Sequence, residues 1–214
     1  MRLNNYLTEW DIEDELDQVD ISAISKILHE CSDMYNLYKK EKRFFYRGVD
    51  ENIDVWVKKY VRGDRNPRAM SIAVKDYLDD YFQKTFGWRA RNGVFATSYV
   101  AHIIDNFDNP YIIFIPNGFK YVWSREFMDL NLGEGDDWLE SIRFKINMGE
   151  RYTEDDEWRD NEITIEQGLA SFTDKDLVGA LKIGNEISFK CPHYYLVNDD
   201  ILTDINTMNW IYNQ

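Results

Sequence analysis

Three short stretches of the sequence place polar side chains inside runs that otherwise have the apolar character of β-strands. They are Tyr46-Arg47-Gly48, Phe95-Ala96-Thr97-Ser98 and Gly184-Asn185-Glu186-Ile187-Ser188-Phe189. A charge or a hydroxyl inside an apolar strand is costly unless it is paired or used, so these residues are the first candidates for chemistry. In chain order they supply an arginine that can hold an anion, a pair of hydroxyls, and a carboxylate that can stabilise positive charge.

Each stretch also has an ordinary structural explanation. Arg47 is typical of a salt bridge at a sheet edge, and Glu186 is typical of a surface carboxylate at the start of a strand. The pair Thr97-Ser98 suits the N-cap of a helix. What favours a shared site is that the three stretches occur together, in order and in similar strand contexts.

This order resembles the Arg, Ser-Thr-Ser and Glu-x-Glu triad of the ADP-ribosyltransferases. The resemblance covers residues 44–197, and phrases such as Gly93-Val94-Phe95-Ala96-Thr97 and Asn185-Glu186-Ile187 are similar to uncharacterised members found in bacteriophages. It implies an α+β fold with an ADP-ribosyltransferase-like split β-sandwich core and N-terminal helices. It also implies an enzyme, an NAD-dependent mono-ADP-ribosyltransferase that transfers ADP-ribose to a host or partner protein.

The resemblance gives the catalytic set as Glu186, Thr97 and Ser98. Cleavage of the nicotinamide–ribose bond of NAD passes through an oxocarbenium-like ribose, and Glu186 would stabilise the positive charge that develops there. Thr97 and Ser98 would orient the nicotinamide ribose and the Glu186 carboxylate.

The same resemblance gives the residues that would bind NAD. Arg47 would hold the pyrophosphate through its planar bidentate donors, which a lysine could not reproduce. Gly48 would let the ligand approach the backbone and bond the nicotinamide amide. Tyr46 and Phe95 would complete this NAD-binding set, in which NAD is the substrate and no metal takes part.

Two positions depart from the family pattern. Ala96 stands where the family has its first serine, which puts the catalytic rate in question. Gly184 stands where members that modify arginine have a first Glu or Gln, which makes arginine a poor guess for the acceptor. The alternative is therefore a catalytically silent interaction or structural protein, phage-encoded, and a third reading is NAD hydrolysis without transfer.

Composition narrows the partners. The 214 residues carry 25 Lys and Arg against 39 Asp and Glu, a net charge of −14, which disfavours a nucleic-acid target and favours a protein acceptor. The two cysteines fit a reducing compartment, and the three histidines lack metal-ligand spacing, so no metal is expected. With no signal-peptide pattern and no run of 18 apolar residues, we expect no membrane association and a cytoplasmic location, the host cytoplasm if a phage encodes the chain.

A single domain is expected, with an N-terminal helical extension over residues 1–43 and an acidic insertion over residues 133–162. Apolar spacing predicts one helix from Ile21 through Tyr38, capped by Asp20, and a second opened by Pro67 and ended by Gly87. Shorter helices are expected over residues 98–107 and 176–181, the latter stopped by Gly184. Strands are predicted over residues 44–49, 94–97, 111–115, 120–123, 186–189 and 194–197, and a closing segment over residues 201–212.

Overall fold

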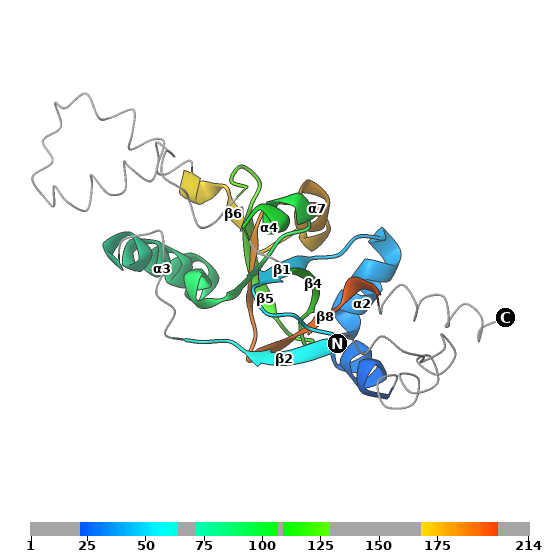
Figure 1. Ribbon diagram of the computed structural model, residues 1–214. Helices are drawn as coiled ribbons and strands as arrows, with labels where there is room; N and C mark the ends of the chain where they lie inside the picture. The colour runs from blue at the N-terminus through cyan, green and yellow to red at the C-terminus, as the bar shows by residue number, and fades with distance from the viewer. Residues whose placement is uncertain (1–21, 64–71, 107–108, 129–167, 201–214) are drawn as a thin grey trace, which may run out of the picture.

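The computed structural model describes residues 22–63, 72–106, 109–128 and 168–200, which form two antiparallel four-stranded sheets (Figure 1). The first sheet contains, in spatial order, β1 (Tyr46–Val49), β4 (Asn109–Phe114), β8 (His193–Val197) and β2 (Trp56–Tyr60). The second contains β3 (Val94–Ala96), β7 (Ile187–Lys190), β5 (Lys120–Ser124) and β6 (Phe172–Thr173). Two antiparallel sheets accompanied by helices agree with the expected α+β class.

Each strand expected from the sequence is present, with its ends displaced by one or two residues. The strands β2 and β6 were not predicted. In β2 the consecutive Lys58 and Lys59 interrupt the apolar alternation that marks a half-buried strand. The strand forms nevertheless, because it pairs along its whole length with β8 and its Lys58 ammonium lies 5.4 Å from the centre of the Tyr195 ring.

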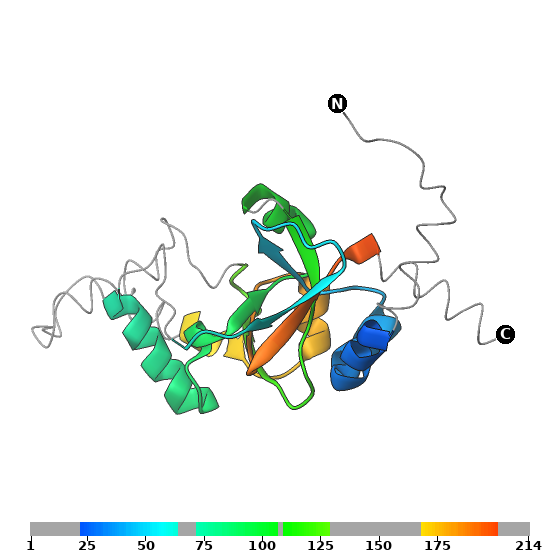
Figure 2. The ribbon, with the colours of Figure 1, turned by 60° about the horizontal axis from the view of Figure 1, so that its bottom comes forward.

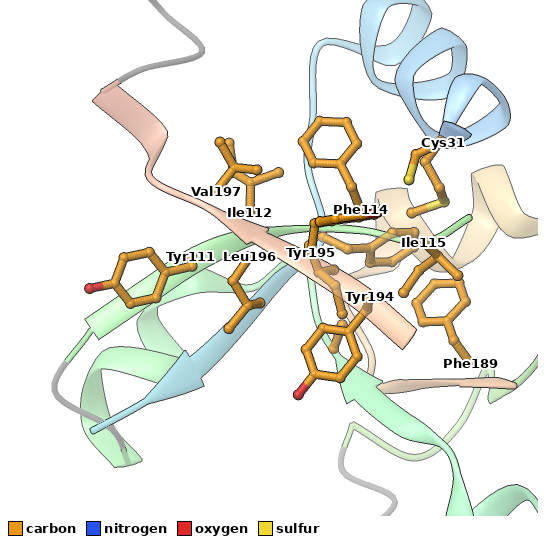
Figure 3. Close-up of a cluster of buried hydrophobic side chains, with 14 of the residues drawn as sticks. Cys31, Tyr111, Ile112, Phe114, Ile115, Phe189, Tyr194, Tyr195, Leu196 and Val197 are labelled. Atoms are coloured by element: carbon orange, nitrogen blue, oxygen red, sulfur yellow. The ribbon is translucent and has the colours of Figure 1, made fainter. Parts of the chain in front are cut away.

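The main core lies between the two sheets and extends under the N-terminal helices. Its largest fully buried side chains include Trp123, Phe45, Phe114 and Phe189. Figure 3 shows Phe114 and Phe189 with side chains of β4 and β8, gathered beside the helical segment at Cys31. Burial of this much aromatic and branched surface is the dominant stabilising contribution to such a fold.

A second, smaller core lies on the other face of the second sheet. Helix α3 (Ile72–Phe86) buries Val74, Leu78 and Phe82 there, against Phe95 and other side chains of the sheet. Figures 1 and 2 show α3 and the N-terminal helices on opposite sides of the pair of sheets. The predicted apolar stripe of this helix is confirmed, and so is its end at Gly87, which has a left-handed φ of 76° and donates its N–H to Gln83 O.

The predicted helix from Ile21 through Tyr38 is wrong in one respect, because it is interrupted at Cys31. Residues 22–30 form one helix and α2 (Ser32–Glu41) forms the next. The interruption is stabilised from outside by Asn117, which follows β4 in the chain. Asn117 donates its backbone N–H to Glu30 O at 2.9 Å, and its side-chain oxygen accepts the N–H of Asp33 at 2.9 Å.

The apolar stripe of this helical pair is nonetheless the one expected. Ile24, Cys31 and Tyr38 are buried in the main core, and Leu28 and Tyr35 pack against its margin. The Tyr38 hydroxyl also donates to Ile113 O at 2.8 Å, which ties α2 to β4. Residues 22–41 therefore contribute directly to the core that the two sheets share.

Glu30, at the end of the first helix, joins the helices to β8. Its carboxylate accepts the Tyr195 hydroxyl at 2.6 Å and lies 2.8 Å from His193 Nε2. The Tyr195 hydrogen bond lowers the pKa of Glu30, partial burial opposes this shift, and the His193 contact and the Lys58 charge also lower it. The charged carboxylate is thus the form that this joint favours.

We predict that Glu30→Gln removes a pH-dependent part of the stability. Because the pKa of Glu30 in the folded protein lies below its ordinary value of 4.5, its contribution is present above that pH and is lost as pH falls through the folded-state pKa. Thermal unfolding should therefore show the wild type more stable at pH 7, and the two proteins should converge only in strongly acidic buffer, below pH 4.5. A gap between the two melting temperatures that does not change with pH would contradict this role of Glu30.

Several expected features lie outside the described residues. These are residues 1–21 of the expected N-terminal extension, with the Asp20 cap, the start of the second helix at Pro67, the acidic stretch 133–162 and the closing segment 201–212. The shorter helices fall inside the described ranges, as α4 (Val100–Asn106) and α7 (Leu177–Ile183). Within the described ranges, no helix combines the length and the apolar character needed to cross a membrane.

Candidate functional site

The edges of the two sheets meet beside Arg47. Tyr46 on β1 donates its N–H to Thr97 O at 2.7 Å, and Thr97 donates its N–H to Tyr46 O at 3.0 Å. Thr97 directly follows β3, so this bridge connects an edge strand of one sheet to an edge strand of the other. The first two of the three candidate stretches are therefore adjacent in space.

The third candidate stretch reaches the same place through the pairing of β3 with β7. Ala96 is paired with Ile187 at the end of this antiparallel ladder. The next residue on each strand is Thr97 on one side and Glu186 on the other. The backbones that carry Arg47, Thr97 and Glu186 are thus brought together, although the residues are far apart in the sequence.

Arg47 is half-buried and held from two directions. Its Nη1 donates to Phe95 O at 2.7 Å, and its guanidinium carbon lies 5.7 Å from the centre of the Tyr194 ring. Its Nε is buried and has no hydrogen-bond partner among the described residues. A buried donor left without an acceptor costs about 1–3 kcal/mol, so the described residues leave part of the hydrogen-bonding capacity of Arg47 unused.

The hydroxyls of Thr97 and Ser98 bond to the chain itself. Thr97 Oγ1 donates to Gly184 O at 2.5 Å and accepts the N–H of Tyr99 at 3.0 Å. Ser98 Oγ donates to Leu181 O at 2.6 Å. Both hydroxyls therefore connect the end of β3 to the end of α7 and to the segment that leads into Glu186.

Glu186 is half-buried and lies just before β7. Its backbone N–H donates to Met128 O at 2.7 Å. The preceding residue, Asn185, is buried and donates its side-chain amide to Ser124 O at 2.9 Å. The position of Glu186 is therefore set by its own backbone N–H and by its neighbour Asn185.

The remaining predicted residues differ in how they meet the site. Gly48 is buried on β1, opposite Pro110. The Tyr46 hydroxyl lies 3.4 Å from an Asp199 carboxylate oxygen, and burial, reinforced by this carboxylate, raises the pKa of Tyr46 to about 12. Phe95 contributes its carbonyl to Arg47, whereas its ring belongs to the second core and lies over the guanidinium of Arg91.

Ala96 and Gly184, where the sequence departs from the pattern that it resembles, each have a local structural role. Ala96 is buried in the main core at its pairing with Ile187. Gly184 ends α7 with φ at 88°, and a Cβ there would lie 3.3 Å from Tyr99 Cβ. Glycine is therefore required at this position by backbone conformation, which side chains such as Glu and Gln rarely adopt.

Three residues beside the site were missed by the sequence reading as site residues. Tyr194 stacks on Arg47, and Asn185 and Ser124 hold the segment that precedes β7. The polar Asn185 next to a candidate carboxylate was the only local signal among them. Tyr194 and Ser124 are ordinary strand residues in the sequence, and only strand pairing brings them here.

Charge is distributed very unevenly along the chain. The described residues contain 18 Lys and Arg against 16 Asp and Glu, and the other residues contain 7 against 23, which together give the totals of 25 and 39. The negative charge therefore comes from residues outside the described ranges, chiefly 1–21 and 129–167. The described residues, among them Arg47, are together close to neutral.

No three His, Cys, Asp or Glu side chains are grouped as metal ligands in the part of the chain that the structure describes. Comparison of the chain with protein-family models, with curated proteins and with solved structures finds no match. The site is accordingly defined by its own geometry.

Proposed function

We propose that this protein binds NAD where its two sheets meet and transfers ADP-ribose to a protein, as a mono-ADP-ribosyltransferase with an ADP-ribosyltransferase-like split β-sandwich. The observation that carries the proposal is the convergence of the strands bearing Arg47, Thr97 and Glu186. A salt bridge, a helix cap and a surface carboxylate, taken separately, do not require these three segments to meet. A ligand that touches all three does.

Arg47 supplies the anion-binding part of the proposal. One of its donors is used by Phe95 O, which fixes the guanidinium, and its buried Nε lacks an acceptor among the described residues. A pyrophosphate oxygen would satisfy this donor and share its charge with the guanidinium. The described residues, with 18 Lys and Arg against 16 Asp and Glu, contribute little of the net charge of −14.

Glu186 supplies the electrostatic part. The nicotinamide–ribose bond breaks with its electron pair leaving on nicotinamide, and the ribose carbon becomes electron-deficient. A fixed carboxylate beside this carbon stabilises the charge. A nucleophilic side chain of the acceptor then bonds to the same carbon and releases its proton to solvent.

Two tasks were expected of Thr97 and Ser98, orienting the nicotinamide ribose and orienting Glu186, and their hydrogen bonds support the second. Their hydroxyls donate to Gly184 O and Leu181 O, so they hold the segment that leads to Glu186 and do not point their protons at NAD. This arrangement also accounts for how the site tolerates Ala96 in place of a serine. The positioning task falls to Thr97 and its neighbour.

Incubation of the wild-type protein with labelled NAD and a cell extract tests the proposal directly. We expect label to appear on protein and nicotinamide to be released in equal amount. Release of nicotinamide without labelled protein would assign NAD hydrolysis in place of transfer. If the wild-type protein shows no NAD binding and no turnover at millimolar NAD, the proposal is wrong.

The second candidate is a catalytically silent protein that keeps the fold for binding. Two observations favour it. The hydroxyls of Thr97 and Ser98 both donate to backbone carbonyls, and Gly184 is fixed as glycine by its left-handed φ. This candidate predicts saturable NAD binding without nicotinamide release, or no binding. The labelling experiment separates it from the enzyme.

A further inference from the structure

Three consecutive residues before β7 are each attached to a different part of the second sheet. Gly184 O accepts Thr97 Oγ1 after β3, and Asn185 donates its amide to Ser124 O at the end of β5. Glu186 donates its N–H to Met128 O, in the turn that follows β5. No two of these bonds share a partner, so together they hold the segment from three separate points.

The middle attachment, from Asn185, is buried. Asn185 is 8% exposed, and its amide reaches a partner 61 residues away in the sequence. If the Asn185 side chain rotated away, its buried amide would lose the hydrogen bond to Ser124 O. The free-energy cost of that loss makes the observed rotamer of Asn185 strongly preferred.

Ser124 is itself rigidly held. Its hydroxyl accepts the backbone N–H of Glu126 and of Phe127, each at 3.1 Å, and lies 2.6 Å from Ser171 Oγ. Ser171 Oγ also lies 2.7 Å from Gly168 O. The partner of Asn185 is therefore a fixed point of the second sheet.

We infer that Asn185 is a positioning residue for Glu186: its bond to Ser124 O and the Glu186 bond to Met128 O fix the intervening peptide and so the direction of the Glu186 carboxylate. This inference rests on the proposed function. Catalytic groups must be held within about 0.5 Å and 10–20° of their working geometry. A displacement of about 1 Å costs on the order of 100-fold in rate, so loss of the Asn185 bond acts on turnover more than on binding.

The test compares Asn185→Ala with Ser171→Ala. Asn185→Ala removes the attachment to Ser124 O, and Ser171→Ala perturbs the same Ser124 network without touching residues 184–186. We expect Asn185→Ala to lower kcat by roughly 10- to 100-fold with the KM for NAD within about threefold. Ser171→Ala should keep kcat near the wild-type value even if its melting temperature falls.

A second variant covers the case in which Asn185→Ala does not fold. Thr97→Val is nearly isosteric and removes the hydroxyl that bonds Gly184 O, so it should give the same loss of kcat at nearly constant KM. Hydrogen exchange at the Glu186 amide should accelerate in Asn185→Ala and stay slow in Ser171→Ala.

The failures are distinguishable. If the wild type turns over NAD and Asn185→Ala has an unchanged kcat, the positioning role is wrong and the proposed function stands. The same holds if kcat falls equally in Ser171→Ala and Asn185→Ala. Absence of turnover in the wild type overturns both.

Discussion

Glu186→Gln is expected to lower kcat by about 10²- to 10³-fold while the affinity for NAD stays within about threefold. The substitution keeps the size of the side chain and removes its charge. Because the positive charge on the ribose develops mainly in the transition state, the carboxylate stabilises that state more than the ground state. Backbone anchoring by Met128 O and by Asn185 should hold glutamine in the same place, so the fold should not change.

Single-turnover nicotinamide release and calorimetric NAD titration of the same preparations measure the two quantities separately. Glu126→Gln is a matched control, since Glu126 is an exposed glutamate in the turn after β5 and undergoes the same chemical change. It should behave as the wild type. A similar loss of turnover in both variants, or a large loss of NAD affinity in Glu186→Gln, would sink the role assigned to Glu186.

Arg47→Ala should lower the affinity for NAD, weakening binding by about 1.5–3 kcal/mol, or roughly 10- to 150-fold in Kd. The pyrophosphate is charged in the ground state and in the transition state alike. Removing its charge-assisted contact with Arg47 therefore weakens the binding of both states. Arg47→Lys should recover only part of the affinity, because an ammonium keeps the charge and lacks the planar fork. The loss of the bond to Phe95 O should also lower the melting temperature.

Arg43→Ala separates the binding effect from the stability effect. Arg43 is an exposed arginine whose Nη1 also donates to a backbone carbonyl, that of Lys182, at 3.0 Å. Its removal should leave the Kd for NAD within about twofold of the wild type by calorimetry. If Arg47→Ala and the wild type have equal affinities for NAD, Arg47 has only a structural role where the two sheets meet.

The candidate site was predictable as a set of residues and not as a geometry. Arg47, Thr97 and Glu186 stand out because each is polar inside an apolar run, a property that can be read locally. Their convergence depends on the bridge between Tyr46 and Thr97 and on the register of Ala96 with Ile187. Strand order and register are set by side chains distant in the sequence, so no local pattern contains them.

What the sequence by itself determined is the local conformation wherever neighbouring residues agree. The alternating or continuous apolar runs became strands, the stripe of α3 became its buried face, and Gly87 and Gly184 ended helices because left-handed φ values suit glycine. Each of these outcomes is signalled by residues within a few positions of one another, although pairing and packing with distant segments complete the structure. The periodicity of side chains and the backbone preference of glycine are enough to predict them.

The tertiary structure alone decided where the long-range partners act. Asn117 lies 84 residues after Asp33 in the sequence, accepts its N–H and so stabilises the helix break at Cys31. Strand β8 pairs with β2 although Lys58 and Lys59 interrupt its apolar alternation. Thr97 and Ser98 became fasteners of the Glu186 segment because α7 ends beside them. In every case a hydrogen bond or a strand pairing with a distant segment changes what a short stretch would do alone, and such a contact exists only in the folded chain.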